Sequence, residues 1–379
     1  MSEQPFGDIP LFREIHRLLS SGGGPINLEI ARQVALAVAT QGSQDPDPRP
    51  DLGRTFDESV REAELLAAGY SRRLFEEPVR AKVIGRAVWV TETLGAWAWL
   101  FEHLAERFTA QMSGLGADEG EGAGALGPAM GQIGPLLLGV QVGSLIGNLS
   151  TEALGRYSFS IPRDDDGLFF VAPNVDQIAI DYGFETEPFA RWLAVHDVAR
   201  HLLFETVPWL KSYLRSQLLE VVDAIDIDVE DLQRRLVEMQ TKGMEALGDD
   251  PKATSLPIAP TERHRRALDR LRAVLAVFEG HAGHIAGAVL PTLLDGSARI
   301  DEGMARRRLS PSEGEQMLAA ILGIALDRDL ETAGATFCKA IIELQGPGAL
   351  DLVWSAPDNL PVTAELKDPF TWMDRVLEA

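Results

Sequence analysis

Cysteine is almost absent from the sequence, with Cys338 the only one in 379 residues. A single cysteine excludes an intramolecular disulfide, and it also excludes a zinc cage built from several cysteines. Cys338 lies in the apolar segment ATFCKAII. We therefore expect its side chain to be buried and to act as a small hydrophobic group.

Basic charge is also scarce, because 35 lysines and arginines are set against 57 aspartates and glutamates. The resulting formal net charge of −22 repels nucleic-acid backbones and anionic lipid surfaces. We expect neither nucleic acid nor a membrane among the partners. The first residues, MSEQPFGDIPLFREIH, lack the basic start and apolar run of a secretory signal, so the expected location is the cytoplasm.

Long, uniformly apolar runs are missing as well. The most apolar segment, residues 126–154, does not supply the ~20 uninterrupted apolar residues that a bilayer requires, because it contains Gln132, Pro135, Gln141, Asn148 and Ser150. Three glycines in it repeat every four residues, at positions 139, 143 and 147, and this spacing lets helices approach closely. We expect a buried central helix. The same glycine spacing would also suit a helix contact between two copies of the chain, so a homo-oligomer is a further possibility.

What the sequence does contain is helical periodicity, with apolar residues spaced by three and four, together with 45% hydrophobic residues, enough for a core. Three stretches rich in glycine, proline or aspartate are expected to be loosely structured: residues 20–25, 41–51 and 113–127. We predict a loosely packed N-terminal arm, residues 1–52, followed by a mainly α domain, residues 53–379, with a small β-hairpin or short sheet. The hairpin is predicted at residues 157–173, where aromatic and β-branched residues flank an Arg-Asp-Asp-Asp-Gly turn.

A helix predicted between Thr186 and Pro208 carries the sequence HDVARH. In the zinc motif H-E-x-x-H, two histidines four residues apart point the same way and bind one ion. Here His196 and His201 are five apart and diverge, while Arg200 occupies the position four after His196 and offers only hydrogen-bond donors. We expect His196 and Arg200 on the core face and His201 at the surface.

A second helix is predicted from about residue 261 to 290, and it contains the sequence FEGHAGH. On its helical wheel Glu279 borders the apolar stripe, His281 is lateral and His284 points away. Glu279 is therefore expected to face the first helix. The pair His281 and His284 is interpreted as a polar flank rather than a ligand pair, and the other histidines are expected at helix surfaces: His16, His103 and His264.

Six segments, in this order, resemble the zincin-like metallohydrolases of bacteria, found mostly in actinobacteria and chloroflexi. They are GPINLEIARQ, VQVGSLIGNLSTEALGRY, LFFVAPNV, AVHDVARHLLFETVPWL, AVFEGHAGHIAGAVLP and ALDLVWSAPDNLPVTAEL, and the resemblance extends over most of the chain, from residue 24 to residue 366. Members of that family are described as zinc-dependent metalloprotease-like proteins or as associated with deazaflavin-coenzyme biosynthesis.

The resemblance implies a role for each matching residue. The better-preserved branch of the family carries H-E-V-T-H on the first helix, and a later E-G-H supplies a third ligand. His196 matches the first histidine, Asp197 the glutamate that acts as general base, Arg200 the second histidine and Glu279 the third ligand. In another branch with the pattern E-x-x-H-H, the final histidine matches His201.

We therefore predict a zincin-like hydrolase scaffold with a degraded metal site, catalytically silent and with no cofactor, in which Arg200 pairs with Glu279 or Asp197. The alternative is an active zinc hydrolase with non-standard coordination by His196, Glu279 and either His281 or Asp197. A third hypothesis is that the protein is a subunit of a larger assembly. The predicted ligand is a peptide or small molecule in a cleft lined by aromatic residues: Trp192, Phe204, Trp209 and Trp354.

Overall fold

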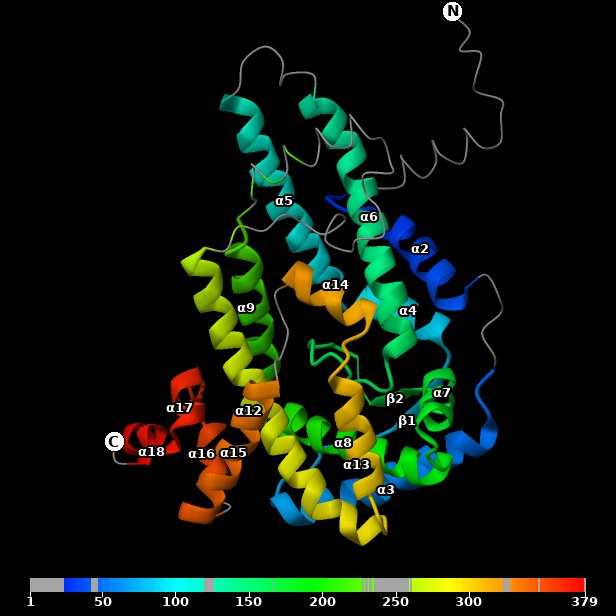
Figure 1. Ribbon diagram of the computed structural model, residues 1–379, viewed down its shortest axis with the longest axis vertical. Coiled ribbons are helices and arrows are strands. Elements are labelled where there is room, and N and C mark those ends of the chain that lie inside the picture. The colour runs from blue at the N-terminus through cyan, green and yellow to red at the C-terminus, as the bar shows by residue number, and fades with distance from the viewer. Residues whose placement is uncertain are drawn as a thin grey trace, which may run out of the picture. The chain divides into compact units, whose positions relative to one another are not determined.

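A computed structural model describes residues 24–41, 47–118, 126–165, 167–226, 228, 231, 234, 259, 261–322, 328–346 and 348–377 (Figure 1). These residues fall into two compact units. Unit 1 takes its described residues from Met1–Gln44, Ala87–Ser150 and Ile225–Ala259. Unit 2 takes its described residues from Asp45–Arg86, Thr151–Ala224 and Pro260–Ala379, and it holds all the candidate site residues.

The described residues of unit 1 form four helices: α2 (Leu28–Thr40), α4 (Arg86–Ala96), α5 (Ala98–Asp118) and α6 (Leu126–Glu152). The helix predicted over residues 126–154 is confirmed as α6, and its glycines face α2. A Cβ atom at Gly139 or Gly143 would lie 2.6 Å from the carbonyl oxygen of Asn27 or Ala31, respectively. The glycine spacing therefore serves a helix contact inside the chain.

The predicted N-terminal arm includes α2, whose Ile30, Ala31, Ala35 and Ala39 are buried. Residue 52, its predicted end, falls within helix α3 (Pro50–Ser71). Residues 1–23 and 42–46 lie outside the described residues, as does most of the stretch 20–25. The division into an arm and a domain therefore stays a prediction.

Unit 2 is mainly α, which confirms the predicted fold class. Its helices besides α3 are α7 (Ala172–Tyr182), α8 (Thr186–Thr206), α9 (Leu210–Asp223), α12 (Glu262–Leu293), α13 (Ala298–Arg308), α14 (Glu313–Leu322), α15 (Arg328–Gln345), α16 (Ala349–Val353), α17 (Thr363–Lys367), α18 (Pro369–Leu377) and a 3₁₀ turn, η3 (Pro357–Asn359). Helix α8 packs against α3 and α12 and also contacts α7 and β2. It is therefore covered on several sides.

The two central helices begin and end close to the predicted residues. Helix α8 runs to Thr206, two residues before Pro208. The side chain of Thr261 caps α12 by accepting a hydrogen bond from the backbone N–H of His264. Helix α12 is also long and apolar enough to cross a membrane, with a window of mean hydropathy 1.4, but 72% of that window is buried inside the structure. This is the composition of a core helix.

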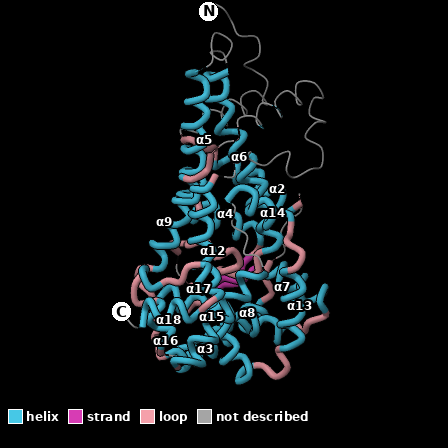
Figure 2. The backbone as a smooth tube through the Cα atoms, turned by 60° about the vertical axis from the view of Figure 1, so that its left-hand side comes forward, coloured by secondary structure: helices cyan, strands magenta, loops and turns pink. Residues whose placement is uncertain are grey.

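The predicted hairpin at residues 157–173 is wrong. The strand β2 (Leu168–Val171) pairs in parallel with β1 (Ala81–Ile84), in the register Ala81 to Leu168. The two strands are coloured magenta in Figure 2. All four residues of β2 are buried, and such a continuous apolar run is typical of a parallel strand covered on both faces. Since Arg156 and Arg163 both bind Asp165, the charged segment is fixed by ion pairs instead of a hairpin turn.

Candidate functional site

Arg200 of α8 binds Glu279 of α12 through two donors. Its Nε lies 2.9 Å from Oε2 and 3.2 Å from Oε1, and its Nη2 lies 2.9 Å from Oε2. A longer contact of 3.4 Å joins Nη1 to Oδ1 of Asp197, one turn earlier. Burial alone lowers the pKa of Arg200, but the two carboxylates outweigh it and raise that pKa. The guanidinium therefore stays charged between two acids, as predicted.

Asp197 is buried, and a methyl group added at Gly155 would overlap its Oδ2. Burial raises the pKa of Asp197 to about 6, against the opposing charge of Arg200 and the backbone hydrogen bonds of Tyr157 and Arg156. Its Oδ2 atom has no hydrogen-bond partner among the described residues. A buried carboxylate with one unsatisfied oxygen is protonated more readily than a solvated one.

His196 lies one turn before Arg200, and its ring packs on Trp192, with centroids 4.0 Å apart. Burial, together with the charges of Arg200 and Arg308, lowers the pKa of His196 well below its ordinary value. Its Nε2 is buried and has no hydrogen-bond partner within the described parts of the chain. His196 is therefore neutral, and one of its nitrogen atoms remains unused.

Sequence reasoning missed Ser160, whose hydroxyl donates a hydrogen bond of 2.9 Å to Oε1 of Glu279. Ser160 has a φ of 50°, in the left-handed region that few non-glycine residues occupy. Glu279 is thus held from two sides, by Arg200 and by Ser160. No local sequence pattern indicates the contact of Ser160 with Glu279. Ser160 lies in the segment that was predicted as a hairpin, far from Glu279 in the sequence.

The prediction that His201 lies at the surface is wrong. His201 is buried, and its Nδ1 is hydrogen-bonded to the hydroxyl of Tyr157 at 2.7 Å. Burial, with the charges of Arg156 and Lys211, lowers its pKa to about 3. The error arose because α8 is covered by several neighbours, whereas the wheel argument assumed a single buried stripe. His201 does not share the hydrogen bonds of Arg200.

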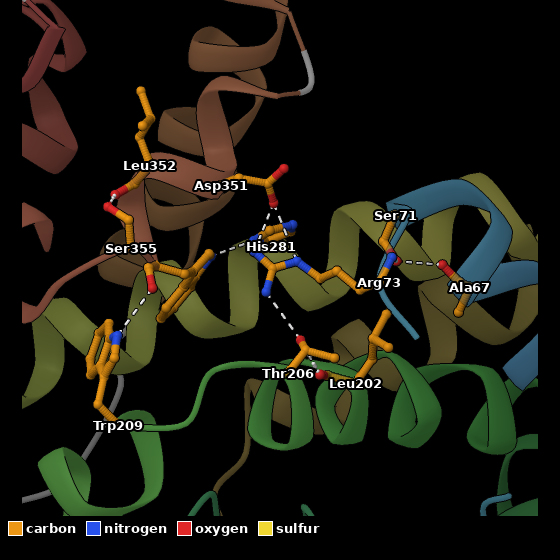
Figure 3. Close-up of polar contacts among 11 residues, drawn as sticks. Ala67, Ser71, Arg73, Leu202, Thr206, Trp209, His281, Asp351, Leu352 and Ser355 are labelled. Carbon is orange, nitrogen blue, oxygen red and sulfur yellow. Dashed lines mark hydrogen bonds and ion pairs between the residues drawn. The ribbon is translucent and has the colours of Figure 1, made fainter. Parts of the chain in front are cut away.

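His281 is also buried rather than lateral, and Figure 3 shows its surroundings. The indole of Trp354 donates a 2.6 Å hydrogen bond to Nδ1 of His281. Nearby, Arg73 donates to Thr206 at 3.0 Å and to Asp351 at 2.7 Å. Burial, then the charge of Arg73, lowers the pKa of His281 to about 3. The residue therefore joins α12 to α16 instead of reaching the Arg200 contacts.

The remaining histidines lie apart from these contacts. His284 was predicted to point away from the core, but it is half-buried, and its Nε2 is hydrogen-bonded to the hydroxyl of Tyr70 at 2.7 Å. His264, expected at a surface, is buried beside the start of α12. His103 is half-exposed in unit 1, and His16 lies outside the described residues.

The four predicted cleft aromatics lie in three neighbourhoods. Trp209 and Trp354 stack with centroids 6.4 Å apart, and the indole of Trp209 donates to the carbonyl of Trp354. Trp192 packs on His196, as described above. Phe204 stacks on Tyr157 at 5.3 Å. Cys338, by contrast, lies where it was predicted: it is fully buried, and burial raises the pKa of its thiol.

A zinc site of three protein ligands does not fit these residues. Among the described residues, no group of three or more histidine, cysteine, aspartate or glutamate side chains is arranged to hold a metal ion. Zinc requires lone pairs from at least three protein groups that converge on one point. Here a guanidinium, which has only donors, lies between Asp197 and Glu279.

Comparison with known proteins agrees with the sequence resemblance. Residues 26–373 match the model of a family described as zincin-like metallopeptidase. The crystal structure of a "putative hydrolase with a novel fold" from Chloroflexus aurantiacus is similar, with a TM-score of 0.69, 25% sequence identity, and coverage of 93% of this chain and 99% of that one. No curated protein matches the sequence. The family match spans most of the chain, and the chain therefore belongs to the zincin-like metallopeptidase family.

Proposed function

We propose that this protein is a zincin-like scaffold in which Arg200 has replaced the metal ion, so that the hydrolytic site is catalytically silent. The observation that carries the proposal is the ion pair of Arg200 with Glu279, at 2.9 Å. Both residues match metal-ligand positions of the family motif, and here they bind each other. A guanidinium supplies a positive charge where an ion would supply one, and it can bridge carboxylates.

A second change supports the same proposal. Asp197 stands where the family motif has glutamate, and it is shorter by one methylene. A general base must reach its water molecule within hydrogen-bond distance, and the side chain of Asp197 is directed toward Gly155 and Arg200 instead. The residue is therefore poorly placed to act as the base of a hydrolysis reaction.

The test is metal binding by the natural protein and by a restored motif. Protein purified without chelators is analysed for metal content and then titrated with zinc. We expect no stoichiometric zinc in the natural protein. The double variant Asp197→Glu/Arg200→His is expected to gain zinc affinity, because it restores the H-E-x-x-H spacing opposite Glu279. The matched control is Arg191→His, which adds a histidine to α8 away from this site.

A second candidate function is an active metal-dependent hydrolase with non-standard coordination. It is favoured by one observation: His196 Nε2 and Asp197 Oδ2 are both buried and have no hydrogen-bond partner among the described residues. Stoichiometric zinc in the natural protein, lost in His196→Ala, would establish this candidate and overturn the silent scaffold. If the restored double variant binds zinc no better than Arg191→His, the assignment of Arg200 and Glu279 to one metal seat is wrong.

A further inference from the structure

Helix α13 is attached to the rest of unit 2 with few buried side chains. Of its 11 residues, the buried ones are Ile300, Gly303 and Met304. They are spaced by three and four, so they form one narrow stripe along the helix. Elements that bury little apolar surface open locally at a lower free energy than core helices. We therefore expect α13 to open more easily than α8 or α12.

Hydrogen bonds of side chains hold α13 in place. The carboxylate of Asp301, in its first turn, accepts a 2.7 Å hydrogen bond from the indole of Trp192 on α8. Near the other end, Arg307 donates to the carboxylate of Glu152 at 2.6 Å and to its backbone carbonyl at 3.1 Å. Such polar contacts can be exchanged for contacts with water, so they fasten the helix without making its opening prohibitive.

The segments on both sides of α13 suit a hinged movement. Gly296, two residues before the helix, has a φ of 77°, a conformation that glycine adopts without strain. After the helix, residues 309–311 are exposed and lead into α14. Helix α13 thus lies between two exposed connections that can absorb a change of backbone angles.

Trp192 connects α13 with the ring of His196. Its indole N–H is bound to Asp301, and its ring packs on the imidazole, with centroids 4.0 Å apart. Besides burial and Arg200, the charge of Arg308 lowers the pKa of His196, so the last turn of α13 also lies near this ring. If α13 moves away, the indole loses its acceptor and is free to rotate off the imidazole.

We propose that α13 is a lid over His196, which turns about Gly296 and residues 309–311 and is kept closed by the hydrogen bond between Trp192 and Asp301. Opening exposes the imidazole, whose Nε2 has no hydrogen-bond partner among the described residues. The lid controls access to the site and does not depend on the replacement of a metal ion by Arg200. Zinc titration tests that replacement and hydrogen exchange tests the lid, so the two proposals fail or succeed separately.

The first test is hydrogen–deuterium exchange of the full natural chain, followed by mass spectrometry of its peptides. We expect the amides of residues 302–308 to exchange at least about tenfold faster than those of α8 and α12, because the lid opens without global unfolding. Equal protection of α13 and α8 would mean that α13 opens only when the whole unit unfolds. That result would overturn the proposal.

Variants of the closing contact test how the lid is held. Asp301→Ala should speed the exchange of α13 by about tenfold, since hydrogen bonds to charged groups are the stronger ones, and should leave α12 unchanged. The matched control is Glu302→Ala, which removes an acid that is 72% exposed and 3.9 Å from Arg306; its effect should be below about twofold. Trp192→Phe should match Asp301→Ala, and the double variant should open no further, because both changes break one bond.

Chemical modification tests what the lid covers. Diethyl pyrocarbonate acylates neutral imidazoles, and burial keeps His196 neutral, so the rate of its modification reports the exposure of the ring. We expect Asp301→Ala to raise this rate by about tenfold, in proportion to the opening. His103, half-exposed in unit 1, should keep its rate. Faster exchange of α13 without faster modification of His196 would show that α13 does not cover this ring, and would overturn the proposal.

Discussion

Unit 2 contains two groups of arginines and acids with opposite proportions. The Arg200 cluster consists of Arg200, Asp197, Glu279 and Ser160. In it, one guanidinium forms ion pairs with two carboxylates. The Asp165 cluster consists of Arg156, Arg163 and Asp165. In it, two guanidiniums form ion pairs with one carboxylate. Both are built from the same kinds of side chain, so the difference between them is one of charge balance.

The pKa values of the acids follow that balance. Burial raises the pKa of Asp197 to about 6, because a single cation shared with Glu279 does not compensate for desolvation. Burial also acts on Asp165, but the hydrogen bonds of Arg163 and the charges of both arginines outweigh it and lower the pKa. The acid that shares one cation, Asp197, therefore holds its proton more tightly, and the acid between two cations, Asp165, holds it more weakly.

The largest expected effect comes from removing the single cation of the Arg200 cluster. Arg200→Met leaves the buried Asp197 and the half-buried Glu279 beside each other without a counter-charge. We expect the free energy of unfolding to fall by about 3–5 kcal/mol at pH 8, the usual cost of breaking a buried ion pair from one side. Urea denaturation monitored by circular dichroism measures it.

Two further variants check that explanation. Arg191→Met, on the same helix but paired with the half-exposed Glu62, is expected to cost less than about 1 kcal/mol. The double variant Arg200→Met/Glu279→Met is expected to recover most of the lost stability, because an apolar pair often replaces a buried ion pair at little cost. If Arg200→Met lowers the free energy of unfolding no more than Arg191→Met does, the Arg200 guanidinium does not stabilise the cluster.

The next effect concerns pH, and it separates the two clusters by sign. The pKa of Asp197 is raised from 3.8 in the unfolded chain to about 6 in the folded protein, so the folded state binds the proton more tightly. Its contribution to stability is present below pH 3.8 and is lost as the pH rises through 6, a change of up to about 3 kcal/mol. Asp165, whose pKa is lowered, contributes stability above its unfolded value of 3.8 and loses it as the pH falls.

The buried histidines, with lowered pKa values, give the opposite slope over an overlapping pH range. The measurement is therefore the difference between the natural protein and Asp197→Asn in urea denaturation from pH 4 to pH 8. We expect Asp197→Asn to be the more stable of the two at pH 8 and to lose that advantage near pH 4. A constant difference across this range would mean that Asp197 does not titrate there.

The helices that build the Arg200 cluster were predictable from sequence, because helix patterns are local. The ends of α8, the cap at Thr261 and the orientation of Glu279 toward Arg200 all follow from residue spacing along one helix. The spacing also showed that His196 and His201 diverge. What it could not show is that α8 and α12 are covered on several sides, which is why His201 and His281 are buried.

The rest of both clusters depends on contacts between distant parts of the sequence. Gly155, Ser160 and Asp165 lie between α6 and β2, and β2 pairs in parallel with residues 81–84. Parallel pairing joins strands that are far apart in sequence, and no local pattern reveals the partner. The hairpin prediction failed for that reason, and Ser160 was missed with it.

The third expected effect tests how closely the two segments approach. Gly155→Ala would place a methyl group onto Oδ2 of Asp197, and we expect it to lower the free energy of unfolding by about 2 kcal/mol, within the range for overpacked cores. In the Asp197→Ala background the same substitution should cost much less, because the overlapping atom is gone. A double-mutant cycle in urea measures this coupling. Additive effects would place the two residues farther apart.

The smallest expected effect is at Tyr157. Its ring stacks on Phe204 at 5.3 Å, and its hydroxyl is hydrogen-bonded to Nδ1 of His201 at 2.7 Å. Tyr157→Phe removes only the hydroxyl and leaves Nδ1 of His201 without this partner, so the free energy of unfolding should fall by about 1 kcal/mol. Urea denaturation of the two proteins measures the change. An unchanged free energy of unfolding would show that this hydrogen bond does not stabilise the fold.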